Sequence, residues 1–294
     1  MIMCVILARY FPDTGWAGAK NRDRNYTPVL DFIEDTSHDV QRMMMHDQIT
    51  GYKEGINNHG ISILNTSLDV YDDETEVEAG TAEVSPDGQV IAKALLQHTV
   101  PDAVKVLIDG KLGGCTIVFD QETLYLIEAS DWDGEREFES VVREVPHDQM
   151  IARTNHGIWL PNAGYQREPT NRSHTLSRIS SESRLALAEA VVATAEEPED
   201  LVDGMCQVYL KDPQLNIMRT STEQKKMRTT SQQLCVPAEH TLYCRPVSSH
   251  LQFDFWGLNQ PNTDVWVEIL SNRALWQNTR GDPPFGHMKM RDVK

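Results

Sequence analysis

The sequence predicts an α+β protein whose sheets are mostly antiparallel. Two observations lead to this fold class. Strand-like and helix-like segments follow one another along the chain as strands, helices, strands, helices and strands. The 294 residues are 40% hydrophobic and 24% charged, which is ordinary for a globular protein with a large core. Because the sequence shows no internal repeat and no linker, we expect one domain over residues 1–294.

Strands dominate the first third of the chain. The segments that predict them are CVILARY (4–10), WAGAKNRD (16–23) and the hairpin GYKEGINNHGISILNTSL (51–68). Gly15 marks the first turn, and residues 57–60 mark the turn of the hairpin. The three methionines at 43–45 are expected to fill gaps in the core rather than bind metal.

The middle of the chain changes from a loop to helices and back to strands. The acidic stretch 69–83 lacks apolar periodicity and predicts a solvated loop. Ser85, Pro86 and Asp87 predict a helix start, and Pro101 predicts the start of a second helix. The helices are expected at 89–98 and 100–109, and the strands that follow at 115–120, 123–130, 140–145 and 150–160.

The second half opens with a loop over 161–173. Apolar residues at helical spacing then predict a helix from Leu176 to Glu196, which Pro198 ends. The remaining predicted elements are a short helix at 199–210, a strand pair at 228–247 that turns at 237–240, and an extended or mobile tail at about 280–294.

Charge and cysteine usage exclude several classes of function. The net charge of −17 repels phosphate backbones and anionic membranes, so we expect neither nucleic acid nor membrane partners. No apolar window is long enough for a transmembrane helix, and no signal peptide is evident. The five cysteines are scattered and form no C-x-x-C pair. That pattern predicts reduced thiols and a cytoplasmic protein.

The first predicted strand pair carries the residues with the most chemistry. Cys4 begins one strand, and Lys20, Arg22 and Asp23 end the other. A thiol becomes a nucleophile when a base or a cation favours its thiolate. Removal of residues 1–3 would free the α-amino group of Cys4, whose reference pKa near 8 suits a general base. Translation from Met3 followed by methionine removal, or autocatalytic cleavage, would expose it.

The pattern resembles the N-terminal nucleophile (Ntn) hydrolases of the choloylglycine hydrolase, penicillin V acylase and acyl-CoA:6-aminopenicillanate acyltransferase type. In that family a mature N-terminal Cys begins a strand, and a second strand carries Arg-Asn-x-Asp. Here Lys20-Asn21-Arg22-Asp23 stands in that place, and Asp23 follows Cys4 by 19 positions, as in the family. Lys20 departs from the usual Arg but keeps the charge. The string NRD also resembles the NRDE-motif proteins.

Three downstream segments extend the resemblance to about residue 247. GINNHGISILN is similar to a family hairpin that ends near a site asparagine, which matches Asn65. ARTNHGIWL is similar to the segment with the oxyanion-hole asparagine, which matches Asn155. SHTLSRI resembles the segment that supplies a site arginine, for which Arg178 is the choice and Arg172 the rival.

The resemblance implies a four-layer αββα sandwich and an amidohydrolase that acts on a small-molecule acyl amide. Cys4 would attack the carbonyl, with Asp23, Lys20 and Arg22 orienting and charging the nucleophile and Asn155 and Asn65 stabilising the oxyanion. No cofactor and no metal is implied, and a homo-oligomer is expected by family analogy only. The alternative is a catalytically inactive Ntn-fold protein that serves binding or structure.

Each residue also has a plainer interpretation. Cys4 alone is most often a small buried hydrophobe, and Lys20, Arg22 and Asp23 alone would be a charged cluster on the surface. Asn155 and Asn65 would satisfy backbone groups, and Arg178 would be a charge on a helix surface. The ten histidines show no zinc-binding spacing, and no G-x-S-x-G, dinucleotide or P-loop motif occurs.

Overall fold

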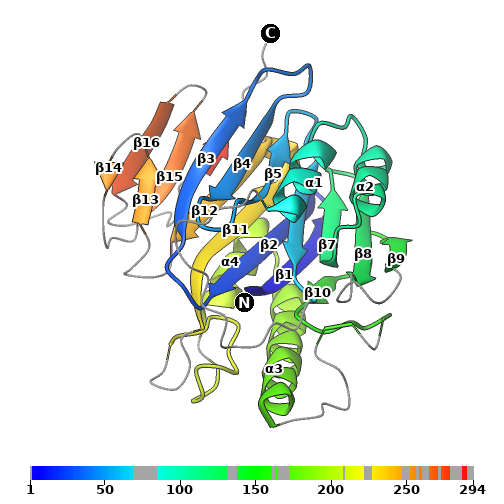
Figure 1. Ribbon diagram of the computed structural model, residues 1–294, viewed down its shortest axis with the longest axis vertical. Helices are drawn as coiled ribbons and strands as arrows, with labels where there is room; N and C mark the ends of the chain where they lie inside the picture. The colour runs from blue at the N-terminus through cyan, green and yellow to red at the C-terminus, as the bar shows by residue number, and fades with distance from the viewer. Residues whose placement is uncertain are drawn as a thin grey trace.

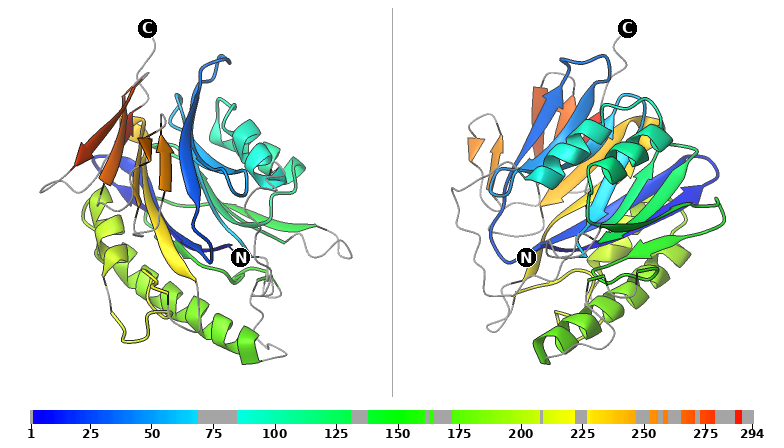
Figure 2. Two further views of the ribbon diagram at one scale, coloured as in Figure 1. Left: turned by 60° about the vertical axis from the view of Figure 1, so that its left-hand side comes forward. Right: turned by 45° about the vertical axis from the view of Figure 1, so that its right-hand side comes forward.

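Two β-sheets stack face to face, and helices cover their outer faces (Figures 1 and 2). The structure is a computed structural model. It describes residues 2–68, 85–130, 138–160, 163–164, 172–207, 209–221, 227–246, 252–255, 258–259, 265–270, 273–278 and 287–289. In this part of the chain the four layers follow the order helices, sheet, sheet, helices, so the predicted α+β sandwich with mostly antiparallel sheets is confirmed.

The first sheet contains both ends of the described chain. Its strands, in spatial order, are β10 (Ile151–Arg153), β1 (Ile2–Phe11), β2 (Gly15–Arg24), β11 (Arg228–Val236), β12 (Thr241–Pro246), β17 (His287–Lys289), β15 (Val265–Leu270) and β16 (Arg273–Asn278). Neighbouring strands are antiparallel except β15 and β17. The β1–β2 hairpin therefore lies inside the sheet, with neighbours on both sides.

The second sheet is built mainly from consecutive strands. In spatial order they are β14 (Leu258–Asn259), β13 (Gln252–Phe255), β3 (Val29–Asp35), β4 (Arg42–Asp47), β5 (Tyr52–Asn57), β6 (Ser62–Thr66), β7 (Gly114–Phe119), β8 (Leu124–Ser130) and β9 (Glu139–Glu144). The pairs are antiparallel except β13 with β3.

Each outer face carries two helices, and the sequence specifies their starts. Helices α1 (Pro86–Ala94) and α2 (Val100–Asp109) cover the second sheet, and α3 (Arg172–Thr194) and α4 (Pro198–Cys206) cover the first. The hydroxyls of Ser85 and Thr99 accept hydrogen bonds from the first turns of α1 and α2, and proline occupies the first helical position or the next. A 3₁₀ turn, η1 (Pro237–Glu239), joins β11 to β12.

Alternation along the strands produces three apolar layers. Ile6 and Ala8 of β1 belong to the cluster between the two sheets, whereas Val5 and Leu7 belong to the cluster beneath α3 and α4. A third cluster, which includes Ile63 of β6, lies beneath α1 and α2. Both faces of β1 are therefore buried, which explains why its sequence reads as a continuous apolar run.

The structure corrects several boundaries that the sequence predicted. Pro198 does not end the long helix, which ends at Thr194; it is instead the first residue of α4. Strands β3 and β4 were not predicted, although the buried methionines at 43–45 belong to β4. The strand predicted at 150–160 spans only Ile151–Arg153. The predicted acidic loop at 69–83 lies outside the described residues, as does the predicted tail apart from β17.

A substitution at Gly55 of β5 tests how closely β4 and β5 are packed. A methyl group added at this position would clash with the backbone of Met43 and Met44 on β4. We expect Gly55→Ala to lower the free energy of unfolding by at least about 2 kcal/mol, measured by urea denaturation. Gly204→Ala is the matched control, because the nearest obstacle to its methyl is a side chain, that of Val191, rather than backbone, and alanine favours helix α4. Equal losses in both variants would contradict this expectation.

Candidate active site around Cys4

The pairing of β1 with β2 fixes the surroundings of Cys4. In the register of this hairpin Cys4 lies opposite Arg22, and Met3 lies opposite Asp23. Because side chains alternate, Lys20 and Arg22 point toward the second sheet, whereas Asp23 points toward the helices. All three are at most 1% exposed, so the interpretation of a charged cluster on the surface is wrong.

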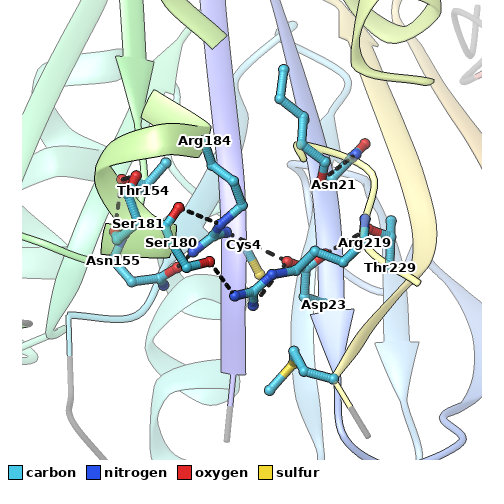
Figure 3. Close-up of polar contacts among 12 residues, drawn as sticks. Cys4, Asn21, Asp23, Thr154, Asn155, Ser180, Ser181, Arg184, Arg219 and Thr229 are labelled. Atoms are coloured by element: carbon cyan, nitrogen blue, oxygen red, sulfur yellow. Dashed lines mark hydrogen bonds and ion pairs between the residues drawn. The ribbon is translucent and has the colours of Figure 1, made fainter. Parts of the chain in front are cut away.

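The helical face of β2 holds the Asp23 carboxylate between two arginines (Figure 3). Arg184 of α3 lies 3.4 Å from Asp23 Oδ2, and Arg219 lies 3.6 Å from the same oxygen. Thr229 donates a hydrogen bond of 2.8 Å to Oδ1. Burial raises the pKa of Asp23, and the two guanidinium groups and the Thr229 hydroxyl oppose that rise. The carboxylate is thus held rigidly by groups from three segments of the chain.

The opposite face of β2 brings a guanidinium to the Cys4 thiol. Arg24 Nη1 lies 3.6 Å from Cys4 Sγ and also donates 2.7 Å to the carbonyl oxygen of Asp23. Both Cys4 and Arg24 are fully buried. Sequence reasoning missed Arg24, although it continues the alternation of Lys20 and Arg22 along a strand that carries cations at every second position.

Lys20 and Arg22 are held by acidic residues of the second sheet. Lys20 Nζ bonds the carboxylate of Glu54 and the carbonyl oxygen of Asn65, the latter at 2.5 Å. Arg22 lies 3.6 Å from Asp47 and 3.7 Å from Glu54. Burial lowers the pKa of Lys20, and the nearby Cys4 and, to a lesser extent, Glu54 oppose that shift. Both predicted cations therefore lie beside β1, and each has carboxylate partners.

The hydroxyl of Thr66 links the side chain of Asn155 to the main chain of Cys4. Its Nδ2 donates to Thr66 Oγ1 at 3.0 Å and to the carbonyl oxygen of Ser67 at 2.8 Å, and its Oδ1 accepts from Arg184 at 3.1 Å. Thr66 in turn donates to the carbonyl oxygen of Cys4 at 3.3 Å. The structure thus brings Asn155 to Cys4, and Arg184 links it to Asp23 as well.

Asn65 has a structural environment. Its Oδ1 accepts from Tyr52 at 3.0 Å, and its Nδ2 donates to the carbonyl oxygen of Gly113 at 3.0 Å and to Thr116 at 2.8 Å. These partners lie on β5, on β7 and just before β7, and none is on β1. Asn65 thus positions β6 and, through its main-chain carbonyl oxygen, Lys20. Its geometry favours the plainer interpretation over the oxyanion role.

Arg184, rather than Arg178, is the arginine of α3 that contacts Asp23 and Asn155. Arg178 forms an ion pair of 2.7 Å with Glu182, one turn along the same helix. Arg172, the rival, is the first residue of α3, and its side chain lies outside the described part of the structure. Neither Arg184 nor Arg219 was singled out from the sequence, because no local motif distinguishes them from other helix or loop arginines.

A buried carboxylate fixes the loop that follows Asn155. Glu128 Oε2 accepts hydrogen bonds from three successive backbone N–H groups, those of Ile158, Trp159 and Leu160, at 2.9, 2.7 and 3.2 Å. Its Oε1 accepts from Arg153 at 3.1 Å. Charged hydrogen bonds of this kind are among the stronger ones in proteins. They hold the segment on either side of Asn155 in place.

His156 is a neutral, hydrogen-bonded residue. Its Nδ1 lies 2.8 Å from Ser181 Oγ and 3.2 Å from Thr154 Oγ1. Burial, followed by the charge of Arg178, lowers the pKa of His156 to about 4. At neutral pH the ring is therefore uncharged and joins β10 to α3.

Within the described ranges, no group of three or more His, Cys, Asp or Glu side chains is arranged to hold a metal ion. Within the same ranges, no helix is long and apolar enough to cross a bilayer.

The similarity of this chain to known proteins lies in its structure and not in its sequence. No family model and no curated protein matches the sequence. Penicillin V acylase from Agrobacterium tumefaciens is 11% identical, with a TM-score of 0.50 over 94% of this chain and 86% of that one. Two variants of conjugated bile acid hydrolase from Clostridium perfringens are 11% identical, with TM-scores of 0.51; they cover 99% and 98% of this chain and 100% and 97% of their own. The chain therefore has the Ntn-hydrolase fold of these proteins.

The depressed pKa of His156 predicts a loss of stability in acid. The unfolded chain binds a proton near pH 6.5, whereas the folded chain does so only near pH 4. Stability from this residue is therefore complete above pH 6.5 and is lost as the pH falls to about 4, by about 3 kcal/mol. Urea denaturation between pH 7 and 4 measures it.

His156→Asn is the control for this pH dependence, because it keeps a polar group near Ser181 without a titrating ring. Its unfolding free energy should fall less steeply between pH 6.5 and 4 than that of the wild type. Identical slopes for the two proteins would show that other groups cause the loss.

Proposed function

We propose that this protein is a cysteine Ntn amidohydrolase that cleaves a small linear carbon–nitrogen amide bond through Cys4. The observation that carries this proposal is the register of β1 and β2, which places Met3 opposite Asp23 and Cys4 opposite Arg22. The similar structures are those of an acylase and a hydrolase, which supports the reaction class. No single functional group of the site could perform the reaction alone.

The α-amine of Cys4 is the proposed general base. Once residues 1–3 are removed, the amine occupies the strand position beside Asp23. The Asp23 carboxylate is buried with Arg184 and Arg219, so the local charge is positive and favours the neutral amine. A neutral amine next to a thiol is able to take its proton.

Proton and electron movements in the proposed reaction balance. The amine takes the proton of Cys4 Sγ, and the thiolate forms a bond to the amide carbonyl carbon while the carbonyl electron pair moves onto oxygen. The tetrahedral intermediate collapses, and the leaving amine departs with the proton from the Cys4 ammonium. Water then attacks the thioester, which releases a carboxylic acid and restores the thiol. These steps use no metal or organic cofactor.

Asn155 is the proposed oxyanion donor. Its amide hydrogens now bond Thr66 Oγ1 and the carbonyl oxygen of Ser67, close to the main chain of Cys4. An oxyanion formed at Cys4 would replace one of these acceptors. Arg184 holds the amide oxygen, so the N–H groups are directed away from the guanidinium. Such a donor is worth about 2.7–4 kcal/mol in transition-state stabilisation.

One observation favours the alternative, a catalytically inactive protein with the same fold. Strand β1 begins at Ile2, so Ile2 and Met3 continue the strand beyond Cys4, and the thiol is fully buried. A chain that keeps these residues has no α-amine at Cys4. The state of the N-terminus therefore separates the two functions.

Cys4→Ala tests the proposed function. Intact-mass measurement of the purified wild type should show a chain that begins at Cys4, and this protein should hydrolyse members of a panel of acyl amides. We expect the variant to lose at least about 1000-fold of that activity, because it lacks the nucleophile. Circular dichroism and thermal unfolding check that it remains folded.

Cys115→Ala is the matched control, because Cys115 is equally buried but lies in the apolar core between the sheets. It should keep the activity of the wild type. An active wild-type protein whose mass still includes residues 1–3, or an active Cys4→Ala variant, would rule out the mechanism.

A further inference from the structure

Three cations of β2 face the same side of the sheet as the Cys4 thiol, but their partners differ. Lys20 is held by Glu54 and the carbonyl oxygen of Asn65. Arg22 is held between Asp47 and Glu54. The side chain that makes a hydrogen bond to Cys4 Sγ is that of Arg24.

The guanidinium of Arg24 is anchored beside the sulfur by three further contacts. Nη1 donates to the carbonyl oxygen of Asp23 at 2.7 Å, and Nε donates to Tyr26 Oη at 3.2 Å. Tyr26 donates in turn to Asp47 at 2.6 Å, and Arg24 Nε lies 3.8 Å from that carboxylate. These bonds fix the plane of the guanidinium, so its position does not depend on the thiol.

Arg24 also has unused hydrogen-bonding capacity in a place without solvent. Its Nη2 is buried and has no hydrogen-bond partner among the described residues. A buried donor of this kind costs free energy unless an acceptor forms nearby. Nη2 of Arg22 is likewise buried without a hydrogen-bond partner in the described ranges, so both arginines leave positive charge uncompensated on this face. A sulfur anion at Cys4 would offset that charge through the contact that Arg24 Nη1 already makes, because a thiolate accepts hydrogen bonds more strongly than a thiol.

The balance of charge on this face also favours a negative charge on Cys4 Sγ. The ion pairs here join three cations, Lys20, Arg22 and Arg24, to two carboxylates, those of Asp47 and Glu54. All five side chains are at most 1% exposed, so solvent screens them little. One more negative charge on this face would neutralise the cluster.

We propose that Arg24 is the residue that holds Cys4 as a thiolate for attack, in the position that the sequence had assigned to Lys20 or Arg22. The inference rests on the proposed function in that Cys4 is the nucleophile. When Sγ gives its proton to the α-amine, the negative charge left on sulfur stays beside the protonated guanidinium. Arg24 neither gains nor loses a proton, and Arg22 helps to position it by pairing with the same carboxylate, Asp47.

The rate of Cys4 alkylation by iodoacetamide tests this role without any substrate. The charged and titratable groups that surround the thiol are Lys20, Arg22 and Arg24 of β2, Tyr26, Asp47 of β4, Tyr52 and Glu54 of β5, and, on the other face of the hairpin, Asp23, Arg184 and Arg219. Rates at pH 6 and pH 9 are measured by mass spectrometry of the Cys4 peptide. Their ratio removes the effect of access to a buried thiol.

An ordinary thiol would react about 200-fold more slowly at pH 6 than at pH 9. We expect the wild-type rate to fall by less than about tenfold. In Arg24→Gln the ratio of the pH 6 rate to the pH 9 rate should fall by at least about tenfold more, the size expected for loss of a charged hydrogen bond. Arg24→Lys should give an intermediate ratio, because an ammonium cannot reach Asp23, Tyr26 and the sulfur together.

Arg42→Gln is the matched control, because Arg42 also pairs with a carboxylate, Asp35, but lies at the opposite end of β4 from Asp47. Its ratio should equal that of the wild type. A wild-type ratio in Arg24→Lys would overturn the proposal, and this variant decides alone if Arg24→Gln does not fold.

The outcome for the inference and the outcome for the proposed function are distinguishable. An Arg24-dependent ratio together with no hydrolysis of the acyl-amide panel by a chain that begins at Cys4 supports the thiolate contact and contradicts the amidohydrolase. Cys4-dependent hydrolysis together with an unchanged ratio in both Arg24 variants supports the amidohydrolase and contradicts the thiolate contact.

Discussion

Strand β2 imposes the constraint on which the rest of the structure depends. All ten of its residues are buried, yet five in succession, from Lys20 to Arg24, are polar or charged. A buried charge is costly unless it is paired and hydrogen-bonded. Because side chains alternate along a strand, partners must arrive from both sides of the sheet at once. The second sheet supplies carboxylates to one face, and α3 and the segment around Arg219 supply arginines to the other.

This requirement connects parts of the chain that are far apart in sequence. Asp47 and Glu54 lie on β4 and β5, whose main role elsewhere is to bury apolar side chains. Asp23 is reached by Arg184, Arg219 and Thr229, which belong to three different segments. Removing one partner would leave a charge unpaired in the interior, so the stacking of the sheets and the packing of α3 are each tied to the same hairpin as Cys4.

The sequence could predict the fold class and the hairpin, because these follow from local pattern. The run from Cys4 to Tyr10 and the turn at Gly15 define the hairpin, and the 19-position spacing predicted that Asp23 lies near Cys4; the register of the structure puts it opposite Met3. Side-chain partners were harder to predict, because they depend on register and on distant segments. Arg184 lies on a helix with two other arginines, and only the packing of α3 against β1 and β10 separates it from Arg178. Arg24 was missed because it falls just outside the family motif, although its parity with Lys20 pointed to the same face.

In the proposed reaction, the nucleophile and the base would lie beside different charge clusters, one on each face of β2. On the inner face, cations exceed carboxylates around Sγ, which favours negative charge on sulfur. On the helical face, two arginines exceed the single charge of Asp23, which disfavours positive charge on an amine placed there. A proton would therefore leave sulfur readily, while the amine that receives it would hold it only briefly before passing it to a leaving group. The proposed reaction would use this combination, and the alternation of side chains along β2, with partners from the second sheet, α3 and the segment around Arg219, accounts for it.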